Sequence, residues 1–405
     1  MLARVVRTTP RLLARLARTT PRLRRLLSTA ASSADGPQQL GVPISATTEH
    51  ILRGSWSGLD TDAPEMMRAL ETSDAALIWH KHSSFIDHLT GVWKMLCAWD
   101  QPRPICRLGL FHSAYSNSFV SMNLFDPKRD RAKVAELIGD KAERLVYGFC
   151  SIDRQSLEDT VLREATVRRD GYTLTHIHTG DDIHVSGPEA AAFVIETLAD
   201  EMEQRFGWQS DLEVGRTAAA WPGPMPPTLR MARTNALALA LRASELVPLE
   251  ALPPIFGRCG VRLEPEAERQ ARDLYWEVIC APALDPTADA AALGEQSAAQ
   301  LTQLDEAARL NPFVGEPHLI KAQVLLQQKR WSEAEAAAAD GVALLAEWAT
   351  SWDKRMPWNA WLNWGRCLAL QAALREWPTT HGGIESLGAT HPRMRFRGLN
   401  TSRNI

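Results

Sequence analysis

An apolar stripe with helical spacing is the feature that most constrains the fold of this 405-residue chain. Residues at steps of three and four lie on one face of an α-helix, and an apolar face must be buried against other elements. Proline disfavours helical geometry in the residue before it, so this helix should stop at Gln101–Pro102. The residues of the stripe are Phe85, Leu89, Val92, Trp93 and Leu96.

The whole stretch from Pro64 to about Asp200 is predicted to be mostly helical. Residues Ala165–Ser186 interrupt this pattern around Thr179–Asp182, a sequence typical of a β-hairpin turn. His176 and His178 would share one face of a hairpin strand, either as exposed polar residues or as a surface metal contact. Further helices are expected at Ile105–Tyr115, about Arg131–Gly139, Asp140–Cys150, and from Pro188 to about Phe206.

A Pro-rich segment, Trp221–Pro227, precedes a second, alanine-rich helical region. In this region one helix ends at Ala307–Pro312, the next spans Glu316–Gln328 and a third begins at Trp331. This order resembles a tetratricopeptide repeat, and the resemblance implies helical hairpins that hold a protein partner in a groove. The nearby tryptophans Trp348, Trp352, Trp358, Trp361 and Trp364 are predicted to pack between helices or to line that groove.

The N-terminus differs in composition from the rest. Residues 1–28 contain eight arginines and no acid, which is typical of a transit peptide, mitochondrial rather than plastid because arginine is dense and serine sparse. The alternative is a disordered basic arm that binds nucleic acid or anionic lipid. Without these eight charges the formal net charge changes from −3 to −11, which disfavours a nucleic-acid partner. No run of about 18 apolar residues occurs, which argues against a membrane span.

Three short motifs place potential metal ligands on separate predicted helices. They are Phe85-Ile86-Asp87-His88-Leu89, Leu110-Phe111-His112-Ser113 and Thr197-Leu198-Ala199-Asp200. Imidazole and carboxylate ligands suit divalent ions, and helical bundles bind metals between facing helices. Residues of these types on facing helices could bind a divalent metal (Mn, Fe, Zn or Co). The alternative is that the histidines are hydrogen-bonded core residues.

The order of these motifs resembles the HD-domain superfamily, and most closely the hydrolase domain of the RelA/SpoT alarmone enzymes. In that group a Tyr-Ile-x-His-Pro-like start supplies the first ligand, a Leu-Leu-His-Asp stretch the next two and a Leu-Ala-Asp stretch the last. The resemblance therefore implies a divalent metal on His88, His112 and Asp200. Residues Ile138–Val146 also resemble a helix of that group, and the resemblance covers about residues 80–206. The expected fold is mainly α: an HD-like helical bundle with an inserted β-hairpin, followed by a tetratricopeptide-like helical-hairpin domain.

The chain departs from this pattern at two places. Ser113 stands where the superfamily has an aspartate ligand, so one metal would be held by three protein groups. Ser116 and Asn117 stand where the alarmone hydrolases carry a Glu-Asp pair that activates water, and neither can act as a general base at neutral pH. In this His-Ser form the motif resembles that of families of unknown function.

Other residues are assigned to the site from the same resemblance and from their positions. Gln204, one helical turn after the last ligand, would orient a ligand or contact the substrate, and Asn117 is placed with it in the catalytic set. His82 would supply a fourth group or contact the substrate. Arg129 and Arg131 would bind the phosphate of the substrate.

These expectations define a function and a domain plan. The predicted function is a metal-dependent phosphohydrolase acting on a nucleotide or small phosphorylated metabolite, with metal-bound water as nucleophile. The alternative is a non-catalytic HD-like ligand-binding or scaffold protein that uses its helical repeat-like domain for protein-protein interaction. The predicted parts are a transit peptide (1–30), a linker (31–63), an HD-like metal-binding domain (64–210), a Pro-rich linker (211–228), a helical repeat-like domain (229–380) and a tail (381–405).

Overall fold

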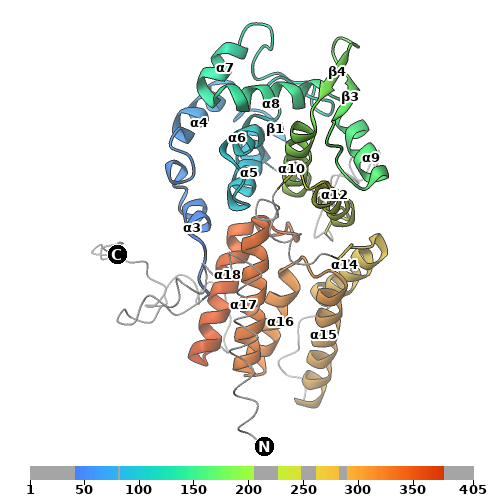
Figure 1. Ribbon diagram of the computed structural model, residues 1–405. Helices are drawn as coiled ribbons and strands as arrows, with labels where there is room; N and C mark the ends of the chain where they lie inside the picture. The colour runs from blue at the N-terminus through green and yellow to red at the C-terminus, as the bar shows by residue number, and fades with distance from the viewer. Residues whose placement is uncertain (1–41, 81–82, 205–226, 248–260, 282–289, 378–405) are drawn as a thin grey trace, which may run out of the picture. The chain divides into compact units, whose positions relative to one another are not determined.

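The computed structural model describes residues 42–80, 83–204, 227–247, 261–281 and 290–377 (Figure 1). Within these ranges the fold is mainly α, as predicted, with 14 α-helices and two small antiparallel sheets of two strands. The predicted transit peptide and tail lie outside the described residues, as does most of the Pro-rich linker. The mitochondrial or plastid location and the domain boundaries therefore stay predictions.

The first helical region holds the three motifs. Helix α10 packs against α5, α6 and α8, and α6 packs against α5 and α8 (Figure 1). The helices are α3 (Ala46–Arg53), η2 (Trp56–Gly58, a 3-10 helix), α4 (Ala63–Thr72), α5 (Phe85–Ala98), α6 (Arg103–Phe111), α7 (Arg131–Ile138), α8 (Asp140–Ser151), α9 (Arg154–Glu164), α10 (Gly187–Gln204) and α12 (Met231–Ser244). The strands are β1 (Trp79–His80), β2 (Ser83–Ser84), β3 (Tyr172–Thr175) and β4 (Asp182–Val185).

Helix α5 confirms the predicted apolar stripe. It begins at a capping box, in which the Ser84 hydroxyl accepts the Asp87 backbone N–H and the Asp87 carboxylate accepts the Ser84 backbone N–H. The helix ends at Ala98, before Pro102. All five residues of the stripe are completely buried. This packing fixes the face of α5 that also carries His88.

Helix α6 lies nearer the N-terminus than predicted. It begins at Arg103, because Pro104 in the first turn lacks only an N–H that has no helical partner there. It ends at Phe111 rather than Tyr115, and Ser116 has a φ of 62°, a left-handed conformation that interrupts a helix. His112 therefore lies at the end of the helix, where the chain enters a loop.

One helix, α3, lies where the sequence did not indicate a helix, and a second, α9, lies in the region predicted to be mostly helical but without predicted bounds. The predicted linker 31–63 contains α3, which Ser45 caps by accepting the Thr48 backbone N–H and which buries Ile51 in the core. Helix α9 follows an Asp153 cap, and its buried residues include Arg154 and Glu158 beside apolar side chains. Such a face has no continuous apolar stripe, so periodicity could not indicate the bounds of this helix.

The predicted β-hairpin is present but shorter than expected. Strand β3 pairs with β4 so that Tyr172 lies opposite Val185. Because β3 ends at Thr175, His176 forms an isolated bridge with Ile152 and His178 lies in the turn. The two histidines therefore do not alternate along one strand.

The second helical region consists of helices that pack in sequence order. Helix α14 packs on α15, α15 on α16, α16 on α17 and α17 on α18. The predicted helix end before Pro312 and the predicted starts at Glu316 and Trp331 are confirmed. Trp348, Trp352, Trp361 and Trp364 are buried, which confirms core packing for four of the five tryptophans. The bounds are α14 (Pro265–Cys280), α15 (Ala290–Leu310), α16 (Glu316–Gln327), α17 (Trp331–Trp348) and α18 (Trp358–Leu374).

The second region contacts the helices that carry the motifs. Trp99, which follows α5, donates from Nε1 to the Glu347 carbonyl at 3.0 Å and packs against Trp348. Lys354 donates from Nζ to the carbonyl of Met202, in the last turn of α10, at 3.0 Å. The C-terminal helices thus support both α5 and α10. Among the described helices, none is long and apolar enough to cross a bilayer.

Glu316 is a buried acid whose ionisation should oppose folding. Its Oε1 accepts the backbone N–H groups of Trp352 at 2.6 Å and Asp353 at 3.1 Å, while its Oε2 is buried without a hydrogen-bond partner. Burial and the nearby charge of Asp353 raise the pKa of Glu316 from 4.5 to about 7. The folded state therefore binds this proton more tightly than the unfolded chain does. The free energy of unfolding should fall as the pH rises from about 4.5 to about 7.

We expect Glu316→Gln to flatten this pH dependence, because glutamine keeps the accepting oxygen and carries no charge. At pH 8 the variant should be more stable than the wild type by about 1–3 kcal/mol in urea unfolding. Glu335→Gln, at an exposed position on α17, is the matched control. Equal stability of Glu316→Gln and the wild type at both pH 5 and pH 8 would show that the charge of Glu316 costs nothing.

Candidate metal centre

The structure brings His88, His112 and Asp200 together from three helices, each with at most 3% of its surface exposed. His88 lies on α5, His112 at the end of α6 and Asp200 on α10. The Nε2 atom of His88 is 3.3 Å from both His112 Nε2 and Asp200 Oδ1, and His112 Nε2 is 3.9 Å from that oxygen. Ligands about 2.1 Å from a tetrahedral ion lie about 3.4 Å from one another. The three side chains could therefore hold a metal ion.

Both imidazoles are fixed through their other nitrogen. Glu203 accepts a hydrogen bond from His88 Nδ1 at 2.5 Å, and the Gly109 carbonyl accepts one from His112 Nδ1 at 2.8 Å. Assigned from these partners, each Nδ1 carries a proton and each Nε2 faces the centre. Histidines that bind metals usually donate their second N–H to a carboxylate or a carbonyl in this way.

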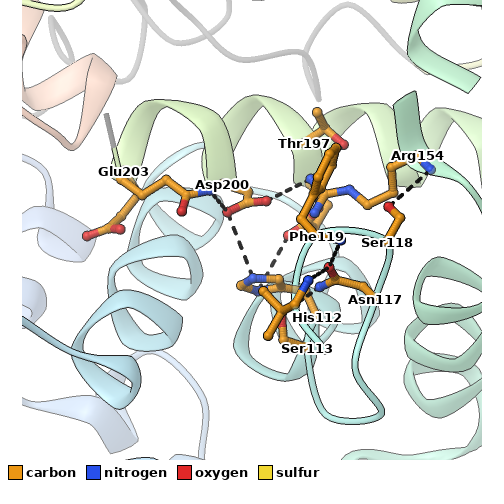
Figure 2. Close-up of polar contacts among 12 residues, drawn as sticks. His112, Ser113, Asn117, Ser118, Phe119, Arg154, Thr197, Asp200 and Glu203 are labelled. Carbon is orange, nitrogen blue, oxygen red and sulfur yellow. Dashed lines mark hydrogen bonds and ion pairs between the residues drawn. The ribbon is translucent and has the colours of Figure 1, made fainter. Parts of the chain in front are cut away.

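Asp200 is oriented by two donors, of which Arg154 is labelled in Figure 2. Arg154 donates from Nη2 to Asp200 Oδ2 at 2.7 Å, and Gln204 donates from Nε2 to Asp200 Oδ1 at 2.7 Å. The guanidinium of Arg154 is buried and lies over the ring of Phe149. The centroid of the Phe119 ring lies 5.2 Å from its central carbon. Although burial opposes ionisation, the charge of Arg154 holds the pKa of Asp200 well below its usual range. Asp200 is thus an ionised carboxylate at neutral pH.

The two histidines have opposite protonation preferences. Burial disfavours a charged imidazole, but the carboxylates of Glu203 and Asp200 raise the pKa of His88 to about 10. Burial lowers the pKa of His112 to about 4. In the metal-free protein His88 is therefore protonated and can donate from Nε2 to the neutral His112. A metal ion would take the place of that proton.

A third carboxyl group, that of Glu196, lies one helical turn before Asp200. It is completely buried, 3.5 Å from His112 Nδ1 and 3.9 Å from Arg154 Nη2, and both of its oxygens lack a hydrogen bond. Burial and the charge of Asp200 raise the pKa of Glu196 well above its usual range. Glu196 approaches the edge of His112 opposite Nε2, so it lies behind the ligand rather than among the ligands.

Ser113 and Asn117, which replace the carboxylates of the resembling enzymes, bind each other. Asn117 donates from Nδ2 to the buried Ser113 hydroxyl at 2.8 Å, and its Oδ1 accepts the backbone N–H groups of Phe119 and Val120. Both polar groups of Asn117 thus hold the loop after α6. No hydrogen bond or ion pair joins Asn117 to the triad among the described residues, so the contacts give no support for its predicted catalytic role.

Gln204 donates a hydrogen bond to the candidate ligand Asp200. This contact agrees with the orienting role predicted for Gln204, and that role stays a prediction. Its Oε1 also lies 3.1 Å from Nε2 of His80. The ring of His80 lies beside that of His88, with centroids 4.6 Å apart. His82 lies outside the described residues. His80 is therefore the histidine that the structure places beside the centre.

Arg129 and Arg131 are not brought to the triad. Arg129 pairs with Asp126 on the surface, and Arg131 makes two hydrogen bonds to Glu143 and stacks on Tyr147. Neither has a hydrogen bond or ion pair to the triad in the described part of the chain. Their contacts are those of residues that hold the loop before α7, so the predicted phosphate-binding role has no support from the geometry.

Two residues that hold the ligands, Glu203 and Arg154, are not among the predicted site residues. Glu203 lies three positions after Asp200, which places both on one face of a helix, so this spacing could have indicated it. Arg154 begins a helix whose bounds the sequence did not indicate, and it is 46 positions from Asp200 along the chain. No local pattern marks it.

Comparison with known families adds one match. Residues 69–154 match a family described as a domain of unknown function (DUF6817). The matched segment contains His88 and His112 and ends before Asp200. An HD-domain family does not match. No curated protein and no solved structure matches the chain.

Proposed function

We propose that this protein is an HD-like, metal-dependent phosphohydrolase that acts on a nucleotide or small phosphorylated metabolite. The observation that carries the proposal is the convergence of His88 Nε2, His112 Nε2 and Asp200 Oδ1 on one point inside the bundle. When bound there, a divalent ion (Mn, Fe, Zn or Co) supplies hydroxide near neutral pH and neutralises phosphate charge. The order of the three residues along the chain is also that of the HD superfamily.

The surrounding residues support this role by holding the ligands in place. Glu203 fixes the ring of His88, and the Gly109 carbonyl fixes that of His112. Arg154 and Gln204 bind the two oxygens of Asp200, so its carboxylate cannot rotate freely. A site whose ligands are held before the ion arrives loses less conformational entropy on binding it.

A non-catalytic ligand-binding or scaffold protein is the second candidate, favoured by one observation. With His88 protonated, the charges of His88 and Arg154 balance those of Asp200 and Glu203, and hydrogen bonds close the network without a metal. In that case the C-terminal helical region would act by binding a protein partner.

Phosphate release by the metal-loaded, full-length protein tests the enzyme proposal against this alternative. We expect the wild type to release phosphate from a panel of phosphorylated metabolites. Asp200→Asn should lower kcat/KM by about 100-fold or more. Loss of a residue that hydrogen-bonds to a metal ligand typically costs about 10–100-fold, and the loss of a ligand itself should cost more. Asp126→Asn, on a surface loop, should be unaffected. A metal-loaded wild type that releases phosphate no faster than Asp200→Asn would favour the scaffold.

A further inference from the structure

The side chains of Cys97 and Cys106 meet where α5 and α6 pack together. Cys97 lies in the last turn of α5, and Cys106 lies near the start of α6, nine positions further along the chain. The thiol of Cys106 donates to the Gln101 carbonyl, with 3.3 Å between the two atoms. The sulfur of Cys106 also forms a hydrogen bond with the Cys97 thiol. Both cysteines are free thiols in the structure, and neither belongs to the metal centre.

The two helices approach each other closely beside this pair. A Cβ at Gly109 of α6 would lie 2.3 Å from Cδ1 of Leu96, the neighbour of Cys97, so any larger side chain there would have to displace Leu96. A disulfide needs Cα atoms about 4.4–6.8 Å apart and a sulfur–sulfur bond of about 2.05 Å. Closely packed helices whose thiols already contact each other suit both requirements. The bond can therefore form while the helices stay packed.

A pocket of about 290 Å³ lies over the pair. Cys97 and Cys106 both line it, together with Asp60, Asp100 and Arg103. A peroxide is small enough to enter, since a water molecule fills only about 30 Å³ in the liquid. Cys97 is half-buried, whereas Cys106 is only 5% exposed. The hydrogen bond with Cys97 and burial raise the pKa of the Cys106 thiol well above its usual range, so Cys106 stays protonated. Oxidation should therefore begin at Cys97.

We propose that a peroxide converts Cys97 and Cys106 into a reversible disulfide. The Cys97 sulfur attacks one oxygen of hydrogen peroxide, the O–O bond breaks, one water leaves, and Cys97 becomes a sulfenic acid. The Cys106 sulfur then attacks the Cys97 sulfur, the S–O bond breaks, and the hydroxide leaves with the Cys106 proton as a second water. The two thiols lose two electrons and two protons, which the peroxide gains. A dithiol reductant reverses the bond by exchange. This inference does not depend on the proposed function.

The disulfide would join the helix that carries His88 to the helix that precedes His112. Closing a loop of about ten residues restricts the unfolded chain and so stabilises the folded state. We expect the Tm of the oxidised protein to exceed that of the reduced protein by about 5 °C or more.

Peptide mass spectrometry on the full-length protein tests the proposal directly. The protein is treated with hydrogen peroxide, its remaining thiols are alkylated in urea, and it is digested with trypsin. Both cysteines then lie on one peptide, Met95–Arg107, because trypsin does not cleave between Arg103 and Pro104. From the oxidised wild type this peptide should lack two hydrogen atoms and carry no alkyl group. After reduction with dithiothreitol it should carry two alkyl groups.

Two substitutions and thermal unfolding serve as controls. Cys106→Ser should leave a sulfenic acid on Cys97 that dimedone traps, and peroxide should not raise the Tm of this variant. Cys280→Ser, at an exposed cysteine outside the pair, should form the disulfide as the wild type does. The proposal fails if the wild-type peptide still carries two alkyl groups after peroxide treatment, if either cysteine bonds instead to Cys280, or if the disulfide forms without raising the Tm.

Discussion

His112→Ala should abolish metal binding, which makes it the substitution with the largest expected effect. It removes one of three ligands and leaves two groups that also bind each other through a proton on His88. The metal affinity should fall by more than about 100-fold, which exceeds the effect of losing a residue that hydrogen-bonds to a ligand. Metal content after dialysis checks this: the wild type should retain about one ion per chain, and the variant almost none.

His178→Ala is the matched control for this experiment, because His178 is exposed in the β3–β4 turn and outside the triad. It should retain metal as the wild type does. Circular dichroism of His112→Ala should show an intact helical fold, since α5, α6 and α10 keep their apolar packing. A folded His112→Ala protein with undiminished metal content would show that the metal binds elsewhere.

The second largest effect on metal binding is expected from a substitution of Glu203, which accepts the hydrogen bond of His88 Nδ1. Glu203→Ala removes the acceptor for His88 Nδ1, so the ring loses both its orientation and its basicity. Loss of such a partner typically lowers metal affinity by about 10–100-fold. A titration against a competing chelator measures this change. A folded Glu203→Ala protein with wild-type affinity would remove Glu203 from the metal centre.

Gly91→Ala tests the same contact without removing a polar group. A Cβ at Gly91 would lie 2.6 Å from Oε1 of Glu203, so the carboxylate must move away from His88. Alanine is favoured over glycine inside a helix, so α5 itself should remain stable. Gly294→Ala is the control, because a Cβ there meets no atom within 4 Å. We expect weaker metal binding in the first variant and no change in the second.

The parts of the fold that the sequence predicted are those controlled by local spacing. The stripe of α5 needs only neighbours along the chain, and so do the helix starts at Glu316 and Trp331. The three motifs could be found because each combines a ligand type with an apolar helical pattern. Their convergence, which is a tertiary property, had to be taken from the resemblance.

What the sequence did not reveal depends on contacts between distant residues. Arg154 lies in a helix whose buried face is partly charged, and its partner Asp200 is 46 positions away. The predicted phosphate-binding role of Arg131 relied on its position after the second motif, but Glu143 and Tyr147 engage its side chain. A charged side chain can pair with many different groups. Its residue type and its position along the chain therefore do not indicate which partner it contacts in the fold.

Anomalous diffraction from crystals grown with Mn²⁺ or Zn²⁺ tests most directly whether the triad is a metal centre. We expect one strong peak at the metal absorption edge, about 2.0–2.3 Å from His88 Nε2, His112 Nε2 and Asp200 Oδ1. The absence of a peak between these three atoms, or a fully occupied ion bound elsewhere in the chain, would contradict the proposed centre.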